Sequence, residues 1–223
     1  MTLAARARFD HVAFDLDGTL IDSRADLASS VNHVLRTMKL PELAPETLYG
    51  YVGEGARVLV ERALGAERGE RFDEGVALFM DYYGAHLLDA TVPYPGMVDV
   101  LDAAAARGVA LSVLTNKPIA LTRRILDGLA LTPRLVGVIG GDSLPVRKPD
   151  PAGLDALRGL SSTSRERTLL VGDSEIDIAT ARAGGVAFCG VGWGLSPEAL
   201  AAAGPERIVH DASELLAVIE RGV

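Results

Sequence analysis

The hydrophobic residues of this chain follow two patterns, and the change between them comes near residue 97. After it, short apolar runs of strand length alternate with segments whose apolar residues recur at helical spacing. The expected strands are 109–114, 135–139, 168–171 and 186–191, and the expected helices are 98–106, 118–129, 151–160, 176–183, 197–203 and 212–221. This alternation predicts an α/β fold, with a Rossmann-like parallel sheet core and helices on both of its faces.

Before that point the chain has one expected strand and a long helical region. The strand is the apolar run 12–14. Apolar residues at helical spacing follow in 27–38, 58–64 and 72–83. The expected breaks between these helices are Pro41, Pro45 and the glycine-bearing turn 48–55. Asp22 or Ser23 is the expected cap of the first helix.

The helical region interrupts the α/β pattern directly after its first strand. We therefore expect two domains. The α/β core consists of residues 1–21 and 93–223, and a small α-helical domain, residues 22–92, is inserted into it.

Polar side chains follow three of the expected strands. Asp15 and Asp17 come after the first strand, Thr115 and Asn116 after the second, and an acidic cluster with Asp173 and Asp177 after the strand that begins at residue 168. A lysine, Lys148, lies in a loop between two prolines. In open α/β sheets the carboxyl ends of the strands form the ligand site, so these segments are expected to meet in one crevice.

Each of these segments has a structural alternative to a functional role. Two carboxylates at a strand end can hold a hard cation, and one of them can act as a nucleophile. Asp-Gly, as in Asp17-Gly18, is also a common turn pair, and acidic residues at the start of a helix stabilise it without any metal. A lysine before a proline is usually a solvated loop residue.

The order of the four segments is the more specific signal. An aspartate pair, a threonine, a lysine and an acidic cluster, each on a strand end or loop, together resemble the haloacid dehalogenase-like superfamily of phosphotransferases. The resemblance implies that Asp15 is a nucleophile that forms an aspartyl-phosphate and that Asp17 is the general acid and base. Lys148 would bridge the phosphate and Asp15, and residues 22–92 would be the cap over the active site.

The resemblance also assigns phosphate and metal ligands. Thr115 and the backbone N–H of Asn116 would hold phosphate oxygens. The implied metal ligands are Asp15, the backbone carbonyl of Asp17, Asp173 and Asp177, the last either directly or through water. Because all of these ligands are oxygens, the expected cofactor is Mg²⁺.

Three further segments, 52–64, 144–149 and 171–177, are similar to the phosphoglycolate phosphatase branch, which hydrolyses 2-phosphoglycolate to glycolate and phosphate. Gly53, Gly55 and Arg57 are then candidates for binding the substrate's carboxylate, although Arg57 also fits a solvated first turn of a helix. The acid at Asp17 separates the chain from the dehalogenase and phosphonatase branches. A phosphatase for another small metabolite, a sugar phosphomutase and a non-catalytic phosphate-binding regulatory protein stay open as alternatives.

The composition narrows the set of partners. The formal net charge is −8, whereas nucleic-acid sites need clustered Lys and Arg, so nucleic acid is not expected as a partner. The partner that the resemblance implies is a small phosphate ester. Of three lysines, Lys117 lies beside the site with an ambiguous role. Cys189 is the single cysteine, which excludes an intrachain disulfide. With no signal-like segment and no long apolar run, the expectation is a cytoplasmic protein without a membrane partner, whose oligomeric state stays open.

Overall fold

Six parallel strands form the central sheet in the computed structural model of the protein, which describes residues 8–223. In spatial order they are β5 (Gly137–Ile139), β4 (Ala110–Leu114), β1 (His11–Phe14), β6 (Thr168–Gly172), β7 (Ala187–Val191) and β8 (Ile208–Val209). Every neighbouring pair is parallel. β1 lies inside the sheet, and its four residues are buried, as expected of a strand covered on both sides.

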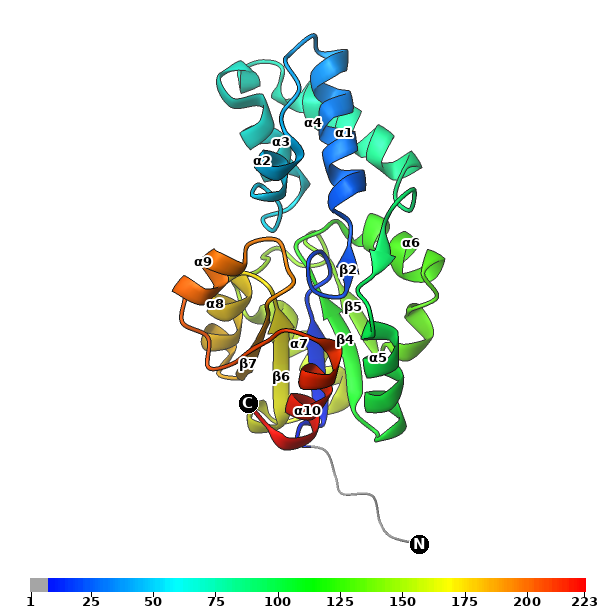
Figure 1. Cartoon of the computed structure of the whole chain (residues 1–223), viewed down its shortest axis with the longest axis vertical. Helices are drawn as coiled ribbons and strands as arrows, with labels where there is room; N and C mark the ends of the chain where they lie inside the picture. The colour runs from blue at the N-terminus through cyan, green and yellow to red at the C-terminus, as the bar shows by residue number, and fades with distance from the viewer. Residues whose placement is uncertain (1–7) are drawn as a thin grey trace, which may run out of the picture.

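The two faces of the sheet carry different helices, because successive side chains of a strand point to opposite faces. Val12 and Phe14 share one apolar cluster with α5 (Met97–Ala106) and α10 (Ala212–Arg221). Ala13 belongs to a second cluster, with α7 (Ala152–Ser161), α8 (Glu175–Gly184) and α9 (Pro197–Ala202). The predicted parallel sheet with helices on both faces is therefore confirmed, and α6 (Ile119–Gly128) completes the helices of this part (Figure 1).

Four α-helices make up the helical region between β1 and the rest of the sheet. They are α1 (Arg24–Thr37), α2 (Pro45–Tyr49), α3 (Ala56–Leu64) and α4 (Phe72–Ala85). Figure 1 shows them beyond the carboxyl ends of the strands, on the side away from the N-terminus. A short antiparallel pair, β2 (Ile21–Asp22) and β3 (Val92–Pro93), joins the two parts.

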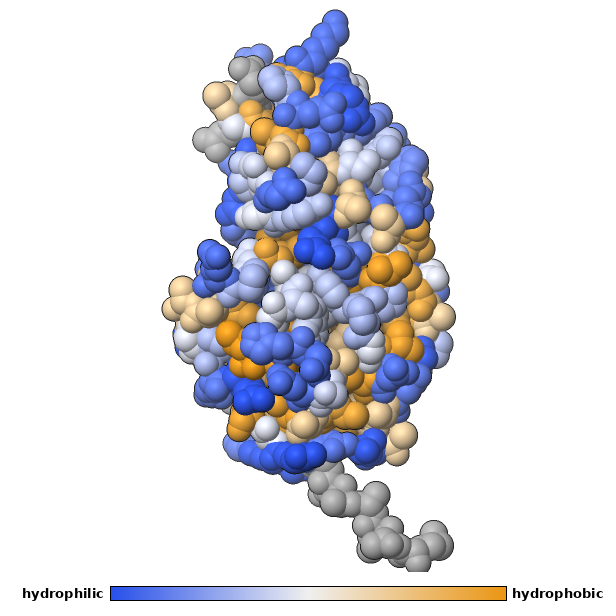
Figure 2. Space-filling model, in the orientation of Figure 1, coloured by the Kyte–Doolittle hydropathy of each residue, from blue (hydrophilic) through white to orange (hydrophobic). Residues whose placement is uncertain are grey.

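The helices of this region pack on one another through their apolar faces. Val31 and Leu35 of α1 are buried together with Phe79 and Tyr83 of α4, in the cluster that continues into the sheet. In Figure 2 hydrophilic and hydrophobic residues are mixed over the visible face of the molecule. Within residues 8–223, no helix combines the length and the apolar character that a membrane crossing requires.

Three details differ from the sequence prediction. Pro45 does more than end a helix, because it begins α2, where its missing N–H has no intrahelical partner to lose. The two-residue strands β2, β3 and β8 were not predicted, since two residues show no alternation. Ser23 occupies the N-cap position of α1, yet its hydroxyl donates to Asp17 rather than capping the helix.

Candidate active site

The register of the sheet brings the predicted polar segments to one edge. Phe14 lies level with Val113 of β4 and Val171 of β6, so the residues that follow these strands emerge side by side. A cleft at this edge is lined by five predicted site residues of the α/β part, which come from four different segments. They are Asp15, Asp17, Thr115, Lys148 and Asp173.

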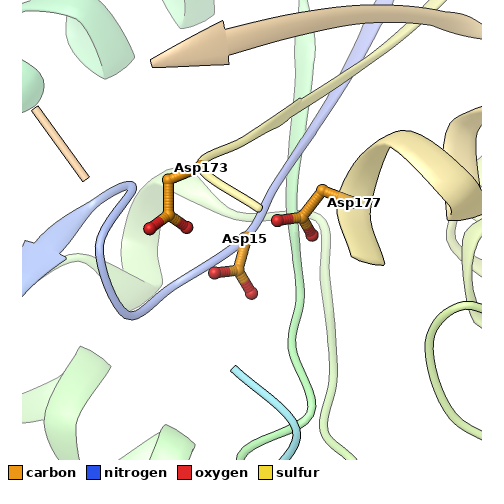
Figure 3. A group of neighbouring side chains, drawn as sticks. All are labelled: Asp15, Asp173 and Asp177. Carbon is orange, nitrogen blue, oxygen red and sulfur yellow. The ribbon is translucent and has the colours of Figure 1, made fainter. Parts of the chain in front are cut away.

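Three carboxylates converge at the base of the cleft. Asp15, Asp173 and Asp177 each place an oxygen within 4.8 Å of the other two (Figure 3). They are 7%, 3% and 1% exposed, respectively. Gly18 allows this approach, because a Cβ at this position would lie 2.2 Å from Oδ2 of Asp173, and its φ of +89° is strained for other residues.

Burial raises the pKa of two of these carboxyl groups, those of Asp15 and Asp173. Burial, opposed by the ammonium of Lys148, raises the pKa of Asp15 from 3.8 to about 7. Burial and the neighbouring charges of Asp15 and Asp177 raise the pKa of Asp173 well above its usual range. Three carboxyl groups around a single ammonium, that of Lys148, leave an excess of negative charge, and such a set of oxygen donors fits a divalent metal ion.

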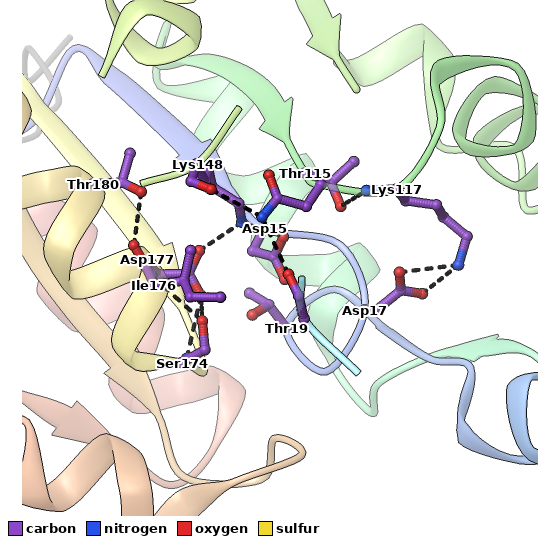
Figure 4. A network of polar contacts seen from close by, with 12 residues as sticks. Asp15, Asp17, Thr19, Thr115, Lys117, Lys148, Ser174, Ile176, Asp177 and Thr180 are labelled. Carbon is purple, nitrogen blue, oxygen red and sulfur yellow. Dashed lines mark hydrogen bonds and ion pairs between the residues drawn. The ribbon is translucent and has the colours of Figure 1, made fainter. Parts of the chain in front are cut away.

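Lys148 lies against two of the three acids. Its Nζ donates to Oδ1 of Asp15 and to Oδ1 of Asp177, both at 2.6 Å (Figure 4). The lysine is only 5% exposed, so it is not the solvated loop residue of the alternative reading. It links the loop after β5 to the end of β1 and the start of α8.

Asp177 also stabilises α8, in whose first turn it lies. Its Oδ2 accepts hydrogen bonds from the backbone N–H of Ser174 at 3.2 Å and from the Ser174 hydroxyl at 2.6 Å. The hydroxyl oxygen of Ser174 in turn accepts from the backbone N–H of Asp177 at 3.4 Å. Helix capping and membership of the acid cluster, which the sequence offered as alternatives, thus occur in the same residue.

Asp17 lies apart from the three-carboxylate group, with its own partners. Its Oδ1 accepts from the hydroxyl of Ser23 at 2.5 Å, and Nζ of Lys117 lies 2.7 Å from Oδ1 and 2.9 Å from Oδ2. Figure 4 shows this ion pair on the far side of Asp15 from Asp177. No partner for Lys117 could be predicted from the sequence. The only indication that it belongs to the site was its position directly after Thr115 and Asn116.

Asn116 has a structural task that its sequence position did not reveal. Its side-chain Nδ2 donates to the carbonyl of Gly53 and to the carbonyl of Lys148, each at 3.2 Å. The amide therefore ties the glycine-bearing turn of the helical region and the lysine loop to the end of β4. Its predicted use of the backbone N–H for phosphate stays a prediction.

The helical region covers the cleft with apolar side chains and glycine backbone. Gly53 and Gly55 line the cleft as predicted, and so does Ala56 at the start of α3. The other lining residues of this region are Leu27, Val52, Leu59, Phe79 and Tyr83.

Arg57 does not line this cleft, and its position matches the second of the two roles that the sequence allowed, a solvated residue in the first turn of a helix. Its guanidinium pairs with Asp73 at 3.0 Å and lies 4.6 Å from the ring centroid of Phe72, and its side chain is 58% exposed. The reason is helical geometry. Ala56 and Leu59 are three residues apart and share the cleft face of α3, so Arg57, which directly follows Ala56, points to another side.

Comparison with known proteins assigns the chain to a family. Residues 12–191 match the family of haloacid dehalogenase-like hydrolases. The chain belongs to this family. The superfamily that the four segments predicted is thus confirmed, and with it hydrolase chemistry.

Several haloacid dehalogenase-like hydrolases are similar over nearly the whole chain. The phosphoglycolate phosphatase of Rhodospirillum rubrum is 39% identical over 212 residues, which cover 92% of this chain and 88% of the relative. That of Pseudomonas putida is 38% identical over 212 residues, 92% of this chain and 78% of the relative. The crystal structure of a predicted phosphoglycolate phosphatase from Haemophilus somnus superimposes with a TM-score of 0.90 at 33% identity, covering 95% of this chain and 98% of the other.

Proposed function

We propose that the protein is a Mg²⁺-dependent phosphoglycolate phosphatase that works through an aspartyl-phosphate on Asp15. The observation that carries this proposal is the buried contact of Lys148 with Asp15 at 2.6 Å, beside two further carboxylates at the base of the cleft. The similarity to phosphatases of this name over 92% of the chain supports the choice of substrate.

Asp15 is the proposed nucleophile. One carboxylate oxygen attacks phosphorus while the bond from phosphorus to the ester oxygen breaks, which leaves an acyl phosphate on Asp15 and an alkoxide. Lys148 holds Oδ1 of the attacking carboxylate and offsets the charge that gathers around the phosphoryl group.

Asp17 is the proposed general acid and base. It gives a proton to the leaving alkoxide, and it then takes a proton from the water that attacks the phosphorus of the acyl phosphate. This second step releases inorganic phosphate and restores the carboxylate of Asp15. The hydrogen bond from Ser23 and the ion pair with Lys117 keep the carboxylate of Asp17 at the cleft.

The other predicted site residues would bind either the metal ion or the phosphate. We propose that Asp15, the backbone carbonyl of Asp17 and Asp173 hold Mg²⁺, with Asp177 binding directly or through water. When bound, a divalent cation offsets the negative charge of the phosphate ester. Thr115 and the backbone N–H of Asn116 would orient the phosphate oxygens.

We further propose that residues 22–92 act as a cap on a core made of residues 1–21 and 93–223; residues 1–7 of that core lie outside the described part of the chain. The apolar residues that the helical region presents to the cleft would keep bulk water away from the reacting groups, while the one water that hydrolyses the acyl phosphate still enters. The hydrogen bonds from Asn116 to Gly53 and Lys148 support this role, since they connect the cap to the end of β4 and to the loop that carries Lys148.

A panel of small phosphate esters assayed with purified protein tests the proposal. With Mg²⁺ present, kcat/KM should be highest for 2-phosphoglycolate. A clear preference for another ester would replace the substrate but keep the reaction. Turnover of a hexose phosphate only with added sugar bisphosphate would indicate a phosphomutase, and binding of phosphate without turnover of any ester would indicate the regulatory alternative.

A further inference from the structure

Lys117 is a buried cation whose only part in the proposed phosphate chemistry is to hold the carboxylate of Asp17. It is 6% exposed, although lysine is rarely buried without a partner. Its Nζ contacts Asp17 and lies 4.8 Å from the ring centroid of Tyr83, which belongs to α4 of the helical region. The ammonium therefore sits where the core and the helical region meet, between an acid and an aromatic face.

The cleft offers few other positive charges. Among the described residues that line it, Lys117 and Lys148 are the only cationic side chains. Lys148 is held by Asp15 and Asp177 at the side of the acid cluster. The lining residues of the helical region are apolar side chains, glycines and Tyr83, so they supply no cation to a second negative group of a substrate.

Lys117 lies where the second negative group of the substrate, its carboxylate, would have to bind. Asp17, as the proposed acid, must reach the ester oxygen of the substrate. In 2-phosphoglycolate the carboxylate is separated from that oxygen by a single methylene. A group in contact with the Asp17 carboxylate is therefore also close to the place where the carboxylate of the substrate must lie, and Lys117 is such a group at 2.7 Å.

We propose that Lys117 binds the carboxylate of the substrate and thereby selects phosphate esters that carry a carboxylate beside the ester carbon. This inference rests on the proposed function, and it assigns to Lys117 the role that the sequence offered to Arg57. Contact with the substrate adds a second carboxylate beside an ammonium that is already buried and oriented, so little desolvation or ordering is needed at binding.

The test compares two esters that differ only at this group. Ethyl phosphate has the chain length of 2-phosphoglycolate with a methyl group in place of the carboxylate. For Lys117→Met, the ratio of kcat/KM for 2-phosphoglycolate to kcat/KM for ethyl phosphate should fall roughly tenfold to a hundredfold, the usual value of a charge-assisted bond. Any disturbance of Asp17 affects both esters and cancels in the ratio.

Two more variants keep the test decisive. Lys117→Gln keeps a hydrogen-bond donor toward Asp17 and removes only the charge, so the ratio should fall here too even if Lys117→Met folds poorly. Arg57→Met is the matched control, a cation removed outside the cleft, and should leave the ratio unchanged.

The two proposals fail in different ways. Equal losses on both esters in the Lys117 variants would mean that Lys117 only positions Asp17, which overturns this inference and leaves the proposed function intact. Wild-type protein that hydrolyses ethyl phosphate as well as 2-phosphoglycolate would overturn the proposed substrate itself. A ratio that falls in Arg57→Met and not in the Lys117 variants would return the role to Arg57.

Discussion

The base of the cleft and its cover are built from opposite kinds of residue. The base holds charged side chains that are almost fully buried and bonded to one another, such as Asp15, Lys148 and Asp177. The cover carries exposed charges on its outside, where Arg57 pairs with Asp73 in an ion pair whose side chains are 58% and 84% exposed. Toward the cleft it presents apolar side chains and glycine backbone.

The difference indicates that the base of the cleft carries out the chemistry, whereas the cover encloses the cleft. A buried charge is costly unless it is paired, so the carboxylates of the base are held by hydrogen-bond donors and a lysine. An exposed ion pair is worth little, and the cover is stabilised by packing instead. Changes in the base should therefore alter turnover, whereas changes on the outside of the cover should leave it nearly unaltered.

The largest effect is expected at the base, for Asp15→Asn. The amide is nearly isosteric but a poor nucleophile, so kcat should fall by about four orders of magnitude or more while the fold is kept. Steady-state assays with 2-phosphoglycolate and circular dichroism of the same sample measure both. Turnover close to the wild-type rate would exclude a covalent intermediate on Asp15.

Removal of divalent metal should also abolish turnover. Protein treated with EDTA should lose activity, and Mg²⁺ should restore it. Ca²⁺ should bind the same oxygens yet support little turnover, because it accepts 6–8 ligands at about 2.3–2.6 Å and can take both oxygens of Asp15. Metal-free protein with full activity would contradict the role assigned to the acid cluster.

The pH dependence of stability should also reflect the buried base. Since the fold raises the pKa of Asp15 from 3.8 to about 7, the folded state keeps a proton in this range that the unfolded chain has released. The free energy of unfolding of metal-free protein should therefore fall as the pH rises from 3.8 to about 7. Urea denaturation at a series of pH values measures it.

The carboxyl group of Asp15 can be tested directly in the same experiment. Asp15→Asn should make the decline with pH shallower, because the amide does not ionise. Saturating Mg²⁺ should make it shallower in the wild-type protein, because the cation binds the ionised carboxylates. An unchanged slope in both cases would show that other groups cause the decline.

A smaller effect is expected within the cover, where the start of α1 meets the segment that leads back to the α/β core. Asp26 of α1 is 5% exposed and accepts hydrogen bonds from the backbone N–H groups of Ala90 and Thr91 and from the Thr91 hydroxyl. Asp26→Ala leaves these donors without their acceptor and should lower the free energy of unfolding by about 3 kcal/mol. Asp81→Ala, at an exposed position of α4, is the matched control and should change it by less than about 0.5 kcal/mol.

The smallest effect is expected on the outside of the cover. Asp73→Ala removes the exposed partner of Arg57 and should lower the free energy of unfolding by no more than about 1 kcal/mol, with kcat/KM for 2-phosphoglycolate nearly unchanged. A loss of activity comparable to that of a variant at the base would mean that this face of α3 takes part in catalysis, and the contrast drawn above would not hold.

The sequence by itself determined the α/β class, the order of the longer elements and the segments that supply the site. These follow from local properties, since strand and helix periodicities show within a few residues and parallel strands bring their carboxyl ends to one edge. The positions of Asp15, Lys148, Asp173 and Asp177 could therefore be predicted from motif order alone.

Only the tertiary structure decided which way the remaining side chains turn. Lys117 and Asp17 are 100 residues apart in the chain, and no local pattern records that they meet. Arg57 and Ala56 are neighbours, yet only Ala56 lines the cleft, because the packing of α3 against α1 and α4 sets which side of the helix faces inward. Ion pairs such as Lys117–Asp17 and the orientation of α3 arise from the packing of whole elements, so residue spacing alone does not predict them.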